Sequence, residues 1–304
     1  MQDMMNEFAN NPKIGQALIT AEMRFLEAGI DSAKKEAEIL LGFFLNFKRI
    51  ELYAKRNQII EDNILNKFQN AVKKRCLAVP LQYITGETYF YGLRLLVSEG
   101  VFIPRPETEV LVEKLIRLAK ASFPNRLKIL ELCTGSGNIS VSLTKNLQYC
   151  TIISSDINIK ALELARQNFQ LHGLSSQIEF IQSDLFKALD KNEAYKQESN
   201  RFDIIVSNPP YVSGEQMSQL PADVLNEPKE ALYGGWDGLD FYRKIISQSC
   251  GYLKKGGYLA FEFGDCQAPS IEKIIKATEI FEPAEFFADL NGIYRFVITR
   301  RING

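Results

Sequence analysis

Histidine is almost absent from this sequence, since His172 is the only one in 304 residues. A histidine-rich metal site is therefore excluded, no metal is predicted, and base catalysis by histidine is not expected. The five cysteines are odd in number and form no CxxC pair. With no sign of secretion, they are expected to be reduced thiols in the cytoplasm.

The sequence also lacks an excess of charge of either sign, since it contains 36 basic and 37 acidic residues. This balance argues against direct nucleic-acid binding, and the short basic cluster at 73–75 is expected to be a solvated helix end. No apolar run approaches the ~18 residues of a membrane-spanning helix, and the first residues do not have the pattern of a signal peptide. We expect a cytoplasmic monomer without a membrane partner.

Three segments of different character follow one another along the chain. Residues 1–80 carry apolar residues at helical spacing and predict a small helical bundle, with stripes over 14–25, 33–45 and 64–72. Residues 81–105 contain two strand-like stretches around Gly92 and predict a β-hairpin linker. Residues 106–304 form the third segment, in which apolar strands alternate with helices.

The third segment predicts an α/β fold of Rossmann type, with a parallel sheet covered by helices on both faces. Its strands are expected within six stretches that share short apolar, β-branched runs: 127–132, 151–156, 178–184, 202–208, 257–263 and 293–300.

Polar groups follow the first three of these strands, at the edge where open α/β sheets bind ligands. Gly135 and Gly137 form a tight turn, Asp156 ends the second strand, and Asp184 with Leu185 ends the third. Each acid alone could merely cap a helix, but together they suit a nucleoside: the turn approaches it, Asp156 binds the ribose, and Asp184 and Leu185 receive the adenine. An NAD enzyme remains a rival that should show a fuller glycine pattern.

The fourth strand delivers Asn208-Pro209-Pro210-Tyr211 to the same edge. Two prolines stiffen this loop and remove two backbone donors. The Asn208 side-chain oxygen and the Pro209 carbonyl can accept both hydrogens of a planar NH2 group, and the Tyr211 ring can pack on its plane. Such acceptors would stabilise positive charge that grows on the nitrogen during methyl transfer from a sulfonium. Asn208, Pro209 and Tyr211 are therefore the candidate catalytic residues.

The chain resembles the release factor glutamine methyltransferases, the HemK/PrmC family, over nearly its full length. Eight motifs carry the resemblance in order: PLQYITGETYFYGL, FIPRPETEVLVE, ILELCTGSG, DINIKALELARQN, SNPPYV, EPKEALYGGWDGLDFYRKI, GYLAFEFGDCQ and DLNGIYRFV. The resemblance implies a class I methyltransferase domain that uses S-adenosylmethionine to methylate N5 of the glutamine in the Gly-Gly-Gln loop of class I peptide chain release factors. The bundle at 1–80 would be either a stabilising cap or a partner-binding module, and with this resemblance we expect it to bind the release factor.

Roles for individual residues follow from the same resemblance. The cofactor would be contacted by Cys133, Thr134, Gly135, Ser136, Gly137, Asp156, Asp184, Leu185 and Asn208. The substrate glutamine would be held by Asn208, Pro209, Pro210, Tyr211, Phe102 and Arg105. Two positions depart from the family, because Cys133 stands where glycine is usual and Leu185 where an aromatic residue is frequent.

Two further functions stay open at this point. An adenine-N6 methyltransferase on DNA or RNA would use similar NH2 chemistry, but should carry phosphate-binding charge. A module that binds a nucleoside and a partner without turnover is the non-enzymatic alternative. The aromatic residues Tyr233 and Trp236 would cover the pocket, contact the release factor or pack locally.

Overall fold

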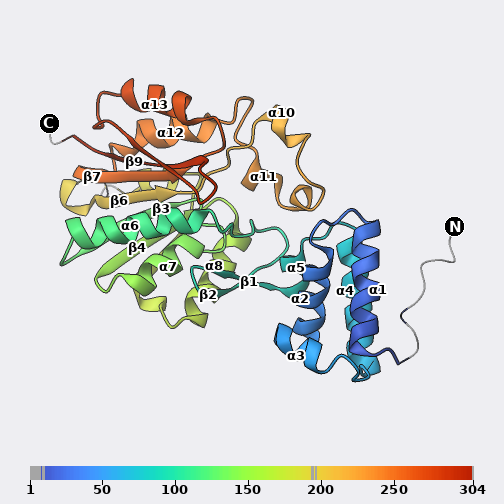
Figure 1. The fold of residues 1–304 in the computed structure, drawn as a ribbon. Helices are drawn as coiled ribbons and strands as arrows, with labels where there is room; N and C mark the ends of the chain where they lie inside the picture. The colour runs from blue at the N-terminus through green and yellow to red at the C-terminus, as the bar shows by residue number, and fades with distance from the viewer. Residues whose placement is uncertain (1–7, 9–10, 193–194, 196, 303–304) are drawn as a thin grey trace. The chain divides into compact units, whose positions relative to one another are not determined.

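The structure is a computed structural model that describes residues 8, 11–192, 195 and 197–302, and it divides into two compact units (Figure 1). The first unit comprises Met1–Gly86 and Ala222–Asn226. The second comprises Glu87–Pro221 and Glu227–Gly304. Within the described residues, no helix is both long and apolar enough to cross a membrane.

The first unit is a helical bundle around its own apolar core. Its elements are α1 (Ile14–Glu27), α2 (Ala33–Leu45), α3 (Arg49–Ala54), α4 (Asp62–Cys76), α5 (Leu81–Thr85) and the short η4 (Val224–Asn226). The predicted stripes become the buried faces of α1, α2 and α4, which meet at residues such as Phe25, Leu40 and Phe68. The helices α3 and α5 were not predicted, since six and five residues are too short to show a helical period.

A buried ion pair crosses this bundle and corrects one expectation. Arg75 was expected at a solvated helix end, but it is only 6% exposed. Its Nε lies 2.5 Å from Glu36 Oε2, and its Nη2 lies 3.1 Å from Asp223 Oδ2. The guanidinium is buried because two carboxylates can pair with it, and one of them lies 148 residues away in the sequence.

The second unit begins with the predicted hairpin, formed by β1 (Glu87–Phe90) and β2 (Leu93–Leu96) in antiparallel register. Asn168 fixes the hairpin to helix α8 (Ile159–Leu171). Its side chain accepts from the Leu96 N–H at 2.7 Å and donates to the Leu96 carbonyl at 3.1 Å. The hairpin is thus fixed to α8, in the same unit as the main sheet.

The main sheet has seven strands in the order β5-β4-β3-β6-β7-β9-β8. Their bounds are β3 (Leu127–Leu132), β4 (Cys150–Asp156), β5 (Ile178–Gln182), β6 (Phe202–Ser207), β7 (Leu253–Glu262), β8 (Glu285–Ala288) and β9 (Tyr294–Arg300). Strands β3 to β7 pair in parallel, as predicted.

The expectation of a parallel sheet throughout is wrong for the last two strands. Strand β8 was not predicted, and β9 runs antiparallel to both β7 and β8. Only residues 289–293 separate β8 from β9. A parallel crossover needs a dozen or more residues, so this connection can only form a hairpin.

Helices cover both faces of the sheet, and each face has its own core (Figure 1). One core contains α6 (Thr108–Ser122), α7 (Asn138–Asn146) and α8. The other contains α9 (Lys187–Asp190), α12 (Asp240–Ser249) and α13 (Ala268–Lys276). The remaining short elements are η1 (Ser175–Gln177), η3 (Glu198–Asn200), α10 (Gly214–Met217) and α11 (Lys229–Leu232).

Alternate residues of a central strand face opposite cores, as Ile205 and Val206 of β6 do. Strand β6 is therefore buried along its whole length. The buried strand gives the loop that follows it a rigid support.

Candidate active site

The predicted site residues follow neighbouring parallel strands, so they gather at one edge of the sheet. Asp184 follows β5, Asp156 ends β4, Cys133 follows β3 and Asn208 follows β6. Glu262 ends β7, the next strand, and therefore continues the same row. The edge carries three carboxyl groups and an amide along five adjacent strands.

The turn after β3 has an unusual backbone. Cys133 has φ +58°, and Gly135 and Gly137 have φ +56° and +78°. A Cβ on Gly137 would lie 3.0 Å from the Cβ of Ala165, so the turn packs closely on α8. The left-handed conformation costs a non-glycine residue about 1–2 kcal/mol. Cys133 tolerates it, and burial raises the pKa of its thiol, which is therefore protonated and unreactive near neutral pH.

Glu131, which the sequence reading missed, supports this turn from below. Its Oε2 accepts hydrogen bonds from Thr134 Oγ1 at 2.5 Å, from Ser154 Oγ at 2.9 Å and from Ser140 Oγ. Burial raises the pKa of Glu131 to about 7, against the lowering effect of these hydroxyls. A lone acid inside an apolar strand, in the stretch LKILEL, was the signal that could have found it.

Two buried oxygens beneath the turn have no hydrogen-bond partner among the described residues. They are Glu131 Oε1 and Ser136 Oγ. An unpaired buried polar atom costs about 1–3 kcal/mol, so such atoms in one turn indicate a place where a ligand or water is expected to bind.

Asp156 ties the turn to the end of β4. Its Oδ2 accepts from the Gly135 N–H at 2.9 Å, and its Oδ1 accepts from the Asn158 N–H at 2.9 Å. Burial raises the pKa of Asp156, and these backbone donors oppose the shift. A carboxylate has about four acceptor positions, so Asp156 can still accept from further donors.

The structure places Asp184 and Leu185 differently from each other. Asp184 Oδ2 forms an ion pair with Lys187 Nζ at 2.5 Å on the protein surface. Leu185 has φ +51° and is 5% exposed, because its side chain belongs to the core of one sheet face. The sequence had assigned both residues to an adenine pocket.

The loop Asn208 to Tyr211 is held by the segment that contains Gly234 and Gly238. Cβ atoms on Gly234 and Gly238 would lie 2.7 Å from the Tyr211 Cα and 2.4 Å from the Tyr211 carbonyl oxygen. That oxygen also accepts from Gln267 Nε2 at 3.0 Å. These two glycines are therefore needed for close approach. Trp236, in the same segment, is 87% exposed.

Two of the motifs that carry the family resemblance, FIPRPETEVLVE and EPKEALYGGWDGLDFYRKI, contact each other. Arg105 donates to Glu227 Oε1, and the Ile103 N–H donates to Glu227 Oε2 at 3.0 Å. The Arg105 guanidinium lies over the Phe102 ring, 4.8 Å from its centroid. Glu227, which was not singled out from the sequence, thus fixes the conformation of the segment 102–105 that precedes α6.

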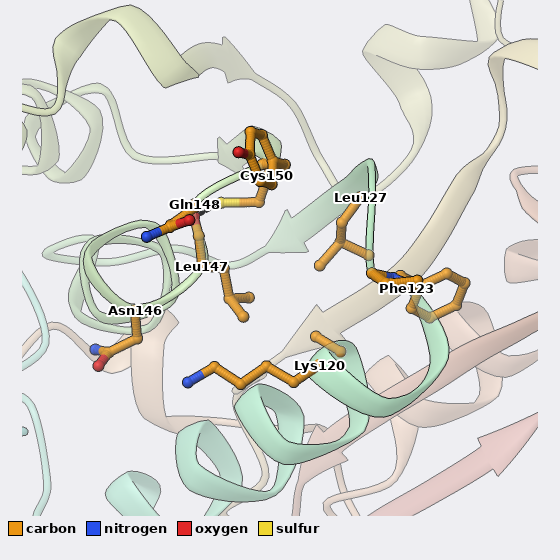
Figure 2. Close-up of a pocket in the computed structure, with 10 residues that line it drawn as sticks. Lys120, Phe123, Leu127, Asn146, Leu147, Gln148 and Cys150 are labelled. Carbon is orange, nitrogen blue, oxygen red and sulfur yellow. Dashed lines mark hydrogen bonds between the residues drawn. The ribbon is translucent and has the colours of Figure 1, made fainter.

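A surface pocket of about 320 Å³ lies at the other end of the parallel strands, where β3 and β4 begin. Figure 2 shows its lining, which comes from the ends of α6 and α7 and the starts of β3 and β4, with Lys120, Leu127, Asn146 and Cys150 among the residues drawn. None of the predicted site residues lines it. This pocket is therefore separate from the row of polar groups.

Comparison with known proteins identifies similar families. Residues 16–86 match the model of the PrmC N-terminal domain, and residues 100–262 match that of the methyltransferase small domain. The chain is 36% identical over 291 residues to the release factor glutamine methyltransferase of Clostridium acetobutylicum, covering 95% of this chain and 99% of the relative. It is 36% identical over 268 residues to that of Thermodesulfovibrio yellowstonii, covering 88% and 92%.

A solved structure shows the same fold. The hMettl16 catalytic domain in complex with MAT2A 3'UTR hairpin 6 has a TM-score of 0.54 at 13% identity, over 82% of this chain and 85% of that chain. With the strand order and the methyltransferase family model, it confirms the predicted Rossmann-like methyltransferase fold.

Proposed function

The chain belongs to the release factor glutamine methyltransferase family, as its motifs predicted, and we propose that it methylates N5 of the glutamine in the Gly-Gly-Gln motif of class I release factors with S-adenosylmethionine. One observation carries the proposal: a rigid Asn-Pro-Pro-Tyr loop lies beside a tight glycine turn at one edge of the sheet. Because release factors act in translation, we propose the cytoplasm as its location.

The residues at this edge fit S-adenosylmethionine. The left-handed turn from Cys133 to Gly137 allows close backbone approach, and the unpaired Glu131 oxygen supplies negative charge below it when ionised. Both features suit a ligand with a sulfonium and an ammonium group. We assign the remaining acceptor capacity of Asp156 to the ribose hydroxyls and the region of Asp184 and Leu185 to the adenine.

The loop residues prepare the substrate nitrogen. The bound cofactor supplies an electrophilic methyl group. The Asn208 side-chain oxygen and the Pro209 carbonyl accept the two amide hydrogens of the glutamine, which draws the nitrogen lone pair out of conjugation and stabilises the developing positive charge. The methylated nitrogen then loses one of its protons to water. The Tyr211 ring packs on the amide plane. Burial raises the pKa of Tyr211 well above its ordinary value, so this ring stays an uncharged phenol.

The pocket wall and the helical unit complete the proposal. Phe102 and Arg105, fixed by Glu227, form the wall of the glutamine pocket. We assign release factor binding to the helical unit, whose α1 exposes more than half of Ile19, Met23 and Leu26 at successive helical turns. The near-neutral charge favours a protein partner over nucleic acid. We also propose that the chain acts as a monomer.

Transfer of a labelled methyl group tests the activity. The full chain is incubated with methyl-labelled S-adenosylmethionine and a class I release factor, the same factor with its motif glutamine replaced, or adenine-containing nucleic acid. We expect label in the first sample alone. Label in the nucleic acid instead would establish the adenine alternative.

Asn208→Ala tests the role of the loop. We expect loss of methyl transfer while the dissociation constant for the cofactor changes by less than about tenfold, because a catalytic hydrogen bond acts mainly in the transition state. Asn146→Ala, at the other end of the parallel strands, is the matched control and should keep its rate. A rate for Asn208→Ala equal to that of this control would remove Asn208 from the chemistry.

A further inference from the structure

A buried polar cluster behind Asn208 has no part in the mechanism described above. Glu262 ends β7 beside β6 and is 1% exposed, and Thr108 begins α6 and is fully buried. Thr108 Oγ1 lies 2.5 Å from Glu262 Oε2 and 3.3 Å from Asn208 Nδ2. Three segments that are far apart in the sequence therefore meet at the side chain proposed to hold the substrate.

The direction of each hydrogen bond follows from the number of protons. Thr108 has one hydroxyl proton, and the 2.5 Å contact directs it to the Glu262 carboxylate, which can only accept when ionised. The hydroxyl oxygen of Thr108 can then only accept from Asn208. The amide of Asn208 must turn its NH2 group to the cluster, since the reverse orientation would place its oxygen against oxygens with no proton between them.

This orientation leaves the oxygen of Asn208 for the substrate. The oxygen has no hydrogen-bond partner within the part of the chain that the structure describes. We infer that Glu262, acting through the Thr108 hydroxyl, is a positioning residue that fixes the amide of Asn208 with its oxygen toward the glutamine nitrogen. The inference rests on the proposed function and extends it from the loop to two residues outside it.

The orientation of the Asn208 amide depends on whether the Glu262 carboxyl group is ionised. Burial raises the pKa of Glu262 to about 7. The hydrogen bonds from Thr108 and Asn208 and the charge of Arg295 oppose this shift, and the charge of Glu107 adds to it. Tyr211 and Tyr242 face it as uncharged phenols, and the Tyr242 hydroxyl donates to the Glu262 backbone carbonyl at 3.1 Å. A protonated Glu262 can itself donate, which would allow the amide of Asn208 to reverse. The ionised form is thus the one that orients the amide correctly, and the rate should rise as the pH rises through about 7.

The positioning role of Glu262 and Thr108 is tested by the kinetics of three variants of this chain, with a release factor as the substrate. Thr108→Val removes the hydroxyl but keeps the shape, and Thr108→Ser restores the hydroxyl. We expect Thr108→Val and Glu262→Gln to lower kcat by about tenfold or more, the effect of one hydrogen bond to a charged group. The affinity for S-adenosylhomocysteine, measured by calorimetry, should change by less than about twofold, since neither residue is assigned to the cofactor. Thr108→Ser should recover most of the rate.

The pH profile separates positioning from simple structural support. The rise in kcat near pH 7 should be present in the wild type and absent in Glu262→Gln. Thr144→Val is the matched control, because Thr144 is also a buried threonine but lies on α7, away from this edge, and its rate should not change.

The outcomes distinguish this inference from the proposed function. A wild type that labels no release factor refutes the function, and the inference falls with it. An active wild type whose Thr108→Val and Glu262→Gln variants keep the wild-type kcat and pH profile refutes the inference alone, as does equal loss of rate and cofactor affinity. If Thr108→Val does not fold, the pH profile of Glu262→Gln decides.

Discussion

Glu131→Gln should change how the stability of the protein depends on pH. The pKa of Glu131 is raised by burial from its ordinary 4.5 to about 7, and the nearby Asp156 adds to the shift. Between these values the unfolded chain is ionised at this position while the folded protein keeps the proton. The unfolded state then binds fewer protons, so the contribution of Glu131 to the free energy of unfolding falls as the pH rises through this window.

The size of this effect follows from the two pKa values. For one such group, the linkage relation gives a loss of about 2.5 kcal/mol between about pH 5 and about pH 8. Glutamine does not ionise in this range, so the variant loses this dependence. Its NH2 group would replace the unpaired Oε1 and leave a buried donor without a partner, at a pH-independent cost of about 1–3 kcal/mol.

Urea unfolding followed by circular dichroism measures the difference. The free energy of unfolding of Glu131→Gln minus that of the wild type should increase by about 2.5 kcal/mol from about pH 5 to about pH 8, because only the wild type loses stability over this range. Glu163→Gln, at an exposed position on α8, is the matched control and should show no such change. A difference for Glu131→Gln that stays constant to within about 0.5 kcal/mol over this range would refute the assignment of a raised pKa.

Two other predictions concern the site. Asp156→Ala should weaken cofactor binding in calorimetry by one or two charge-assisted hydrogen bonds of about 1.5–3 kcal/mol each, and unchanged affinity would reject the ribose assignment. Gly238→Ala should lower stability and methyl transfer strongly, because its Cβ would lie 2.4 Å from the Tyr211 carbonyl oxygen at φ +76°. Gly292→Ala, at φ +80° with open space around it, should cost only about 1–2 kcal/mol of backbone strain, and equal losses in thermal melts would contradict the packing role.

The elements of this protein with a strong local pattern were predicted from the sequence. The helical stripes gave α1, α2 and α4, and apolar runs gave six of the seven strands of the main sheet. Because successive parallel strands end at one edge, the sequence also predicted that Asp156 and Asn208 would gather there. Local periodicity sufficed, since each of these elements shows its buried face within a few residues.

The partners of the buried charges were decided only by the tertiary structure. Thr108 and Glu262 are 154 residues apart, and Arg105 and Glu227 are 122 apart. No local pattern encodes such pairs, because a buried carboxyl group is tolerated only where donors from other segments converge on it. The same holds for Glu131, whose acidic side chain the sequence shows within an apolar strand but whose three hydroxyl donors come from the turn after β3, α7 and β4. The sequence thus determined the strands and the loop that hold the site, and the folded chain determined which buried groups orient it.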